Sequence, residues 1–357
     1  MAGIFGAIAE NDHERAFIIT AGQQLVWETA QKWIADRNAE MAASLSVFVE
    51  DETEGFKERY KLPGGCFLQR RGADASVGAV KAGGSWDVSF PLEDFGAAIA
   101  WNDVDIAYMS ALELSNHFET VMMQNINTVR WEILHRLFDN VRGAFTDPIH
   151  GALTPEPLAN GDTVVFPPVL GSNTEATEDH YLESGYTAAN ISDTNNPLAT
   201  IRDDIEHHFG AATGGENIVV FVNNAQRSQL EALTDFDEVP DRYIRVGDNA
   251  DVPAVLPSVP GRILGRSSGV WVVEWRWISA NYMLGLHLDQ PAPLKMRVDP
   301  ADTGLGRGLQ LVAKDMEYPF TTSYWRHRFG IGGGNRLNGV AMELGTGGTY
   351  TIDTNYD

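Results

Sequence analysis

The segment Gly265-Arg266-Ser267-Ser268-Gly269 matches the pattern G-x-S-x-G, in which a nucleophilic serine stands on a sharp turn between a strand and a helix. With Ser267 as the nucleophile, His327 and an acid such as Asp289 would complete the triad of an acidic serine hydrolase. The residues that follow the motif, 270–275, are mostly β-branched or aromatic and predict a strand instead of the required helix. We therefore interpret the segment as a hairpin turn and keep the hydrolase as a distant alternative.

Two further patterns suggest cofactor or metal chemistry and lack the spacing for it. The glycines of residues 330–334 resemble a nucleotide-binding loop, but Leu337 replaces the third glycine and no helix is predicted to follow. His207 and His208 follow Glu206 on a predicted helix without forming H-E-x-x-H, and adjacent side chains on a helix point about 100° apart. We predict no catalytic, cofactor-binding or metal-binding residues, and hence a protein that is not an enzyme.

The composition excludes several other classes of protein. Lys and Arg total 26 against 49 Asp and Glu, which gives a formal net charge of −23 over 357 residues. Binding to nucleic acid or to an anionic membrane needs clustered cations, so this balance disfavours both. The one cysteine, Cys66, excludes an intrachain disulfide and a cysteine-based zinc cluster. No apolar run reaches the roughly 20 residues that span a bilayer, and residues 1–10 lack the basic start of a signal peptide. We expect a soluble protein of about two compact units that is not exported.

Helical spacing of apolar residues predicts two helices in the first part of the chain. One runs over residues 21–43, and a much longer one runs over 103–142, with Asp103 as its N-cap and Gly143 at its end. At about 1.5 Å per residue the second helix would be roughly 60 Å long.

A long hairpin is predicted between these helices, over residues 45–92. Residues 45–50 alternate as a strand does, and residues 66–71 are predicted to form a return strand after Pro63-Gly64-Gly65. Within 57–81 the hairpin carries six basic residues, namely Lys57, Arg59, Lys61, Arg70, Arg71 and Lys81. It has few large apolar residues, so it must lie on another surface, and its charge favours the acidic body of a second copy. A solvated hairpin, or one packed on its own chain, remains the alternative.

The remaining chain predicts an α+β unit that follows an acidic region. Residues 143–201 contain eight acidic residues and neither Lys nor Arg, which predicts turns and short strands with a solvated face. From residue 198 onward, helices at 198–209 and 225–233 stand among short strands such as 218–222, without the spacing of β-α-β crossovers.

This order of elements resembles the major capsid protein of tailed double-stranded DNA bacteriophages (Caudoviricetes), whose fold is named HK97-like after bacteriophage Hong Kong 97. The segments that carry the resemblance are residues 86–91 before the long helix, 219–223 before a short helix, 291–297, and 324–330. The resemblance implies an N-terminal arm, an extended loop, a peripheral domain built on the long helix, an axial domain and a tail. In that order the parts are residues 1–44, 45–98, 99–200 together with 320–350, 201–319, and 351–357.

The resemblance further implies a structural protein that assembles as hexamers and pentamers into an icosahedral shell around double-stranded DNA. Assembly would take place in the host cytoplasm, and the product would be the capsid of the virion. A separate scaffolding protein, a portal and a decoration protein are the implied partners. In each contact the basic loop would reach acidic residues on the long helix of a neighbour, with Glu113, Glu119 and Glu132 as the candidates. The alternative within the same fold is the shell of a bacterial encapsulin nanocompartment.

Overall fold

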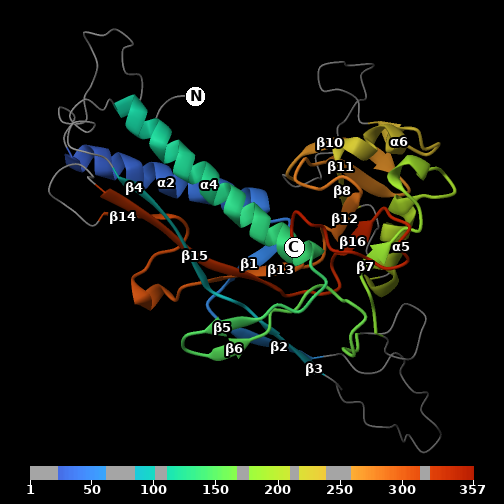
Figure 1. Cartoon of the computed structure of the whole chain (residues 1–357), viewed down its shortest axis with the longest axis horizontal. Helices are drawn as coiled ribbons and strands as arrows, with labels where there is room; N and C mark the ends of the chain where they lie inside the picture. Colours follow the sequence, from blue (N-terminus) through green and yellow to red (C-terminus); the bar gives the residue numbers. More distant parts are fainter. Residues whose placement is uncertain are drawn as a thin grey trace, which may run out of the picture. The chain divides into compact units, whose positions relative to one another are not determined.

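The structure is a computed structural model of the chain. It describes residues 23–61, 85–100, 111–166, 177–209, 217–238, 259–313 and 322–357. The chain divides into two compact units, each built from three separate stretches of sequence. Unit 1 comprises residues 1–44, 92–132 and 297–330, and unit 2 comprises residues 45–91, 133–296 and 331–357. Because both units are discontinuous, each depends on pairing between elements that are far apart in the sequence (Figure 1).

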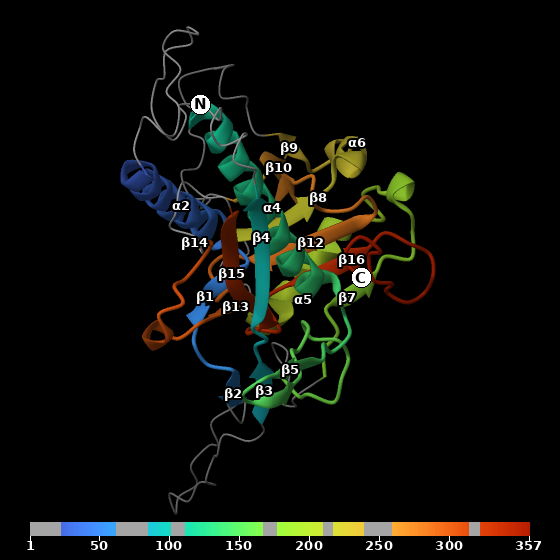
Figure 2. The same cartoon turned by 60° about the vertical axis from the view of Figure 1, so that its left-hand side comes forward.

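Unit 1 packs two helices against one face of a sheet. Strand β15 (Thr322–Gly333) pairs antiparallel with both β4 (Glu93–Ala100) and β14 (Gln310–Ala313). Helices α2 (Gln23–Leu45) and α4 (Ala111–Phe138) lie against this sheet (Figure 2).

The core of unit 1 contains apolar side chains that recur every three or four residues on the helices. Its buried members are Ala30, Ile34, Leu114, Phe118, Val121, Met122, Leu309, Leu311 and Trp325. The edge of the Phe118 ring packs on Trp325, with ring centroids 5.0 Å apart. This spacing places one apolar stripe of each helix on the sheet.

Unit 2 is built on a mixed sheet of seven strands. In spatial order the strands are β7 (Tyr181–Glu183), β16 (Val340–Glu343), β12 (Tyr282–His287), β8 (Ile218–Val222), β11 (Val270–Glu274), β10 (Arg262–Ser267) and β9 (Asp237–Glu238). All five residues of the central strand β8 are buried, which explains its uninterrupted apolar sequence. The short helical segments of the rest of the unit are η2 (Ala188–Asn190), η5 (Asn224–Gln226) and α6 (Arg227–Glu231).

Helix α5 (Pro197–Phe209) packs closely on this sheet at Gly285 of β12. A methyl group added at Gly285 would lie 2.2 Å from Cγ2 of Ile201. The absence of a side chain at this position therefore sets the distance of closest approach between the helix and the sheet.

The hairpin contains β2 (Lys57–Lys61) and β3 (Ser85–Ser89), paired antiparallel from Lys57 opposite Ser89 to Lys61 opposite Ser85. Three further pieces complete the structure. These are the neighbouring strands β1 (Val49–Thr53) and β13 (Leu294–Val298), the small hairpin of β5 (Phe145–Asp147) and β6 (Gly151–Leu153), and the turn η6 (Ala301–Thr303).

Several predicted elements need correction. Residues 45–48 are not a strand, since α2 continues to Leu45 and a turn follows before β1. The partner of β2 is β3, while the predicted return strand at 66–71 lies outside the described residues.

The long helix ends at Phe138, four residues before its predicted end, while residues 103–110 lie outside the described part. The side chain of Asp139 accepts a hydrogen bond from the N–H of Val141 at 2.8 Å. This local contact competes with the helical hydrogen bonds and terminates the helix.

The described helices include none that is long and apolar enough to cross a membrane.

Candidate functional site

The G-x-S-x-G motif forms the hairpin turn that its sequence predicted. Ser268 and Gly269, with φ values of 53° and 83°, connect β10 to β11, and a strand follows where a hydrolase requires a helix. Ser267 is 2% exposed and its hydroxyl donates to Oδ1 of Asp235 at 2.7 Å. The Ser268 hydroxyl and N–H both donate to the other carboxylate oxygen of Asp235. The serine therefore belongs to a structural turn.

The two proposed partners of Ser267 have structural roles as well. His327 is buried, and its Nδ1 lies 2.7 Å from Oδ1 of Asn125. Burial lowers the pKa of His327 to about 4, so the ring is neutral at physiological pH. Asp289 accepts a hydrogen bond from Asn217. These contacts leave the hydrolase alternative without support.

The glycine-rich segment at 330–334 serves close packing. A side chain at Gly333 would place its first carbon 2.5 Å from the backbone oxygen of Glu156, and one at Gly332 would lie 2.8 Å from that of Ser89. The backbone of β15 therefore passes too close to other backbone for any larger residue.

Among the described residues, no group of three His, Cys, Asp or Glu side chains is arranged to hold a metal ion. Nε2 of His207 lies 3.3 Å from Glu178, and its Nδ1 lies 3.7 Å from Asp204. The side chain of His208 lies outside the described residues.

Two of the six predicted hairpin cations are described in full, and both bind a carboxylate of the same hairpin. Nζ of Lys57 lies 2.8 Å from Asp87, and Nε of Arg59 lies 2.6 Å from it. Hydrogen bonds from these cations hold the pKa of Asp87 well below its usual range. Arg70, Arg71 and Lys81, together with the side chain of Lys61, lie outside the described residues.

The base of the hairpin is joined to the rest of unit 2 by Lys295 of β13. Its Nζ lies 3.2 Å from Glu58 and 3.7 Å from both Glu50 and Asp51. Burial raises the pKa of the neighbouring Tyr60 to about 12, so its hydroxyl stays protonated. The hairpin is therefore anchored to its own chain at this end.

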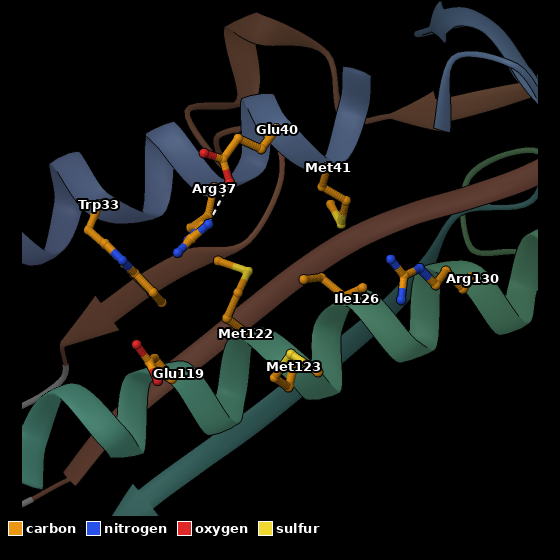
Figure 3. A pocket seen from close by; sticks show the side chains of 9 residues that line it. All are labelled: Trp33, Arg37, Glu40, Met41, Glu119, Met122, Met123, Ile126 and Arg130. Atoms are coloured by element: carbon orange, nitrogen blue, oxygen red, sulfur yellow. Dashed lines mark hydrogen bonds and ion pairs between the residues drawn. The ribbon is translucent and has the colours of Figure 1, made fainter. Parts of the chain in front are cut away.

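A groove of about 400 Å³ lies between α2 and α4 of unit 1, and we call it the helix groove (Figure 3). Its lining residues are Trp33, Arg37, Glu40, Met41, Glu119, Met122, Met123, Ile126 and Arg130. Methionines line its middle, and Met123 is 54% exposed. Arg37 lies over the Trp33 ring and its Nη1 is 2.6 Å from Glu40. A flexible apolar surface with charges along its borders suits contact with another polypeptide.

Of the three acidic residues predicted on the long helix, Glu119 lines the helix groove. Glu113 and Glu132 lie on the same helix outside the groove lining. Sequence reasoning missed the groove itself, because methionines at helical spacing also fit a buried core. The adjacent pair Met122 and Met123 was the available signal, since both side chains of such a pair cannot face the same core.

No protein-family model and no curated protein sequence matches this chain. Among solved structures, a chain of Mycobacterium phage Patience is similar over 93% of this chain and 91% of its own length, with a TM-score of 0.66 at 18% identity. The capsid structure of cyanophage P-SCSP1u covers 83% of this chain and 86% of that chain, with a TM-score of 0.47 at 9% identity. The mature capsid of bacteriophage PhiM1 covers 83% and 85%, with a TM-score of 0.48 at 11% identity. This chain has the α+β, HK97-like fold that its sequence predicted.

Proposed function

We propose that this chain is the major capsid protein of a tailed bacteriophage, a structural subunit that assembles as hexamers and pentamers into the icosahedral shell around double-stranded DNA. The observation that carries the proposal is the similarity to the Mycobacterium phage Patience chain, which spans nearly all of both chains. Likeness to a chain from a phage favours a phage capsid over an encapsulin shell. The protein would act as a structural component of the capsid shell and not as an enzyme.

The helix groove is the surface that we assign to contact between copies. The hairpin segment that includes Arg70, Arg71 and Lys81 would reach the groove of a neighbour, where Glu119 and the Arg37-bound Glu40 line the surface. Each exposed ion pair contributes only about 0–1 kcal/mol. Burial of Met123 and its neighbours, repeated around the shell, would contribute most of the association free energy.

The parts named from the sequence are proposed to divide this work. Residues 1–44 would form the arm, and 45–98 the loop that overlies a neighbour. Residues 99–200 with 320–350 would form the peripheral domain, and 201–319 the axial domain at the symmetry axes. A scaffolding protein, a portal and a decoration protein would join the shell as separate chains.

Electron microscopy of the purified protein, alone and with a scaffolding protein, tests the assembly. We expect hexamers, sheets or closed shells, whereas a monomer that persists at high concentration would refute the proposal.

The groove is tested by Met123→Glu, which would place a charge in the apolar contact. This variant should prevent assembly at an unchanged melting temperature, because Met123 is already 54% exposed in the monomer. Gln124→Glu, at the exposed neighbouring position on α4, is the matched control and should still assemble. Loss of assembly in both variants would show that added charge on this helix, rather than the groove, is responsible.

The hairpin contact is tested by reversing Arg70 and Arg71 to Glu together. We expect a weaker assembly and little change in the free energy of unfolding of the monomer. Equal losses in both measurements would show that the hairpin packs on its own chain.

A further inference from the structure

A second hollow, which we call the hairpin pocket, lies in unit 2 where β3 of the hairpin meets the segments around residues 142, 156 and 164. Its volume is about 310 Å³. The residues that line it are Arg59, Ser85, Trp86, Asp87, Arg142, Glu156, Val164 and Arg336.

Arginines dominate the hairpin pocket, in a chain that carries a net charge of −23. Arg59 binds Asp87, while Arg142 lies 2.9 Å from Glu156 and 3.1 Å from Asp162.

Lys57 and Arg336 add two more positive charges, since Lys57 shares Asp87 and Arg336 shares Asp162. Among the described side chains, four cations thus face three carboxylates, which leaves an excess of one positive charge. In addition, burial raises the pKa of Glu156, which shows that its negative charge is poorly stabilised there.

Two donors at the pocket wall have no hydrogen-bond partner among the residues that the structure describes. The Arg336 side chain is fully buried, and it donates from Nε to the Pro157 oxygen at 2.7 Å and from Nη2 to Asp162 at 2.9 Å. Within the described part of the chain, its Nη1 has no hydrogen-bond partner, and neither has Nε1 of Trp86. Buried donors are almost always satisfied in folded proteins, so two in one wall indicate a missing acceptor.

We propose that the hairpin pocket binds one small oxyanion, a phosphate or a carboxylate. The side chains of Arg59 and Arg142 are 64% and 48% exposed, so their guanidinium groups can bind the anion directly. Arg336 and Trp86 line the same pocket, and their unpaired N–H groups add positive charge and hydrogen-bond donors to it. A volume of about 310 Å³ and a single excess charge suit one anionic group better than a polyphosphate.

The anion has two sources, which share the same chemistry. It is either free phosphate or the side-chain carboxylate of an Asp or Glu from a second copy. The second source rests on the proposed shell function, whereas the first is independent of it.

The first experiment titrates inorganic phosphate into dilute, unassembled protein at constant ionic strength and follows heat release. We expect saturable binding with a dissociation constant on the order of 1 mM. Arg59→Gln should raise this constant at least tenfold or so, because a charge-assisted contact is lost. This variant leaves Asp87 paired with Lys57, so the hairpin keeps its local ion pair.

Two further variants separate the pocket from general charge effects. Trp86→Phe keeps a ring against Phe166 but removes the unpaired N–H, and it should also weaken binding. Arg227→Gln is the control, because it also removes one arginine, from an ion pair with Glu231 on α6. This variant should bind phosphate as the wild type does.

A second experiment, at assembling concentrations, identifies the source of the anion. If phosphate slows assembly of the wild type and not of Arg59→Gln, a carboxylate of a second copy occupies the pocket. If phosphate binds and the rate of assembly does not change, the ligand is the free anion. If phosphate binds but no shell ever forms, the site stands and the proposed function fails. The proposal is overturned if phosphate shows no saturable binding and does not change the rate of assembly. It is also overturned if Arg59→Gln binds phosphate as tightly as the wild type.

Discussion

Asp204 on α5 offers the sharpest test of the electrostatics of unit 2. Its side chain is largely buried, and burial together with the charges of Glu178 and Asp179 raises its pKa from 3.8 to about 7. Nδ1 of His207 lies 3.7 Å from the Asp204 carboxylate. The nearby His180 stays neutral, since burial lowers its pKa to about 4.

A carboxyl group whose pKa is raised by folding binds its proton more tightly in the folded state. Folding therefore takes up a proton between about pH 4 and pH 7, and the free energy of unfolding falls as the pH rises through this window. For pKa values of 3.8 unfolded and about 7 folded, Asp204 makes the protein about 2 to 3 kcal/mol less stable at pH 8 than at pH 5.

We therefore expect the free energy of unfolding of Asp204→Asn, measured relative to that of the wild type, to rise by about 2 to 3 kcal/mol from pH 5 to pH 8. Urea unfolding followed by circular dichroism at pH 5, 6, 7 and 8 measures the difference. Asp203→Asn is the matched control, because Asp203 is the next residue on the same helix and its side chain is 67% exposed.

Parallel pH profiles for the wild type and Asp204→Asn would refute this reasoning. A gain of the same size in Asp203→Asn would also count against it, since that result would reflect the net charge of the chain and not the burial of one carboxylate.

Two stability predictions follow from close packing and from buried charge. Gly285→Ala should destabilise unit 2 by about 1–3 kcal/mol in urea unfolding, because its methyl group would meet Ile201 at 2.2 Å. Gly347→Ala is the control in the same unit, because its added carbon would meet only the Thr349 oxygen, at an ordinary contact distance of 3.9 Å. Arg336→Met should lower the free energy of unfolding by about 3–5 kcal/mol, because buried acceptors lose their hydrogen-bond donor and Asp162 loses an ion pair. A melting temperature that matches the wild type would contradict either prediction.

Local sequence determined the features whose causes lie within a few residues. The turn at Ser268 and Gly269 follows from its neighbours, because these two small residues directly precede a strand-forming run rich in valine. The apolar sequence of β8 predicted a strand, and helical spacing predicted α2 and α4 to within a few residues at each described end. The order of these elements was sufficient to predict the HK97-like fold.

Tertiary structure alone decided which distant segments meet. Periodicity identifies a strand without naming its partner, so the pairing of β2 with β3 across the interval 62–84 was not predictable. The hairpin pocket joins Arg59, Arg142 and Arg336, whose separation along the chain hides any pattern. The helix groove likewise exists only where two apolar helix faces fail to close completely. Such sites depend on the packing of the whole unit, and no local propensity encodes them.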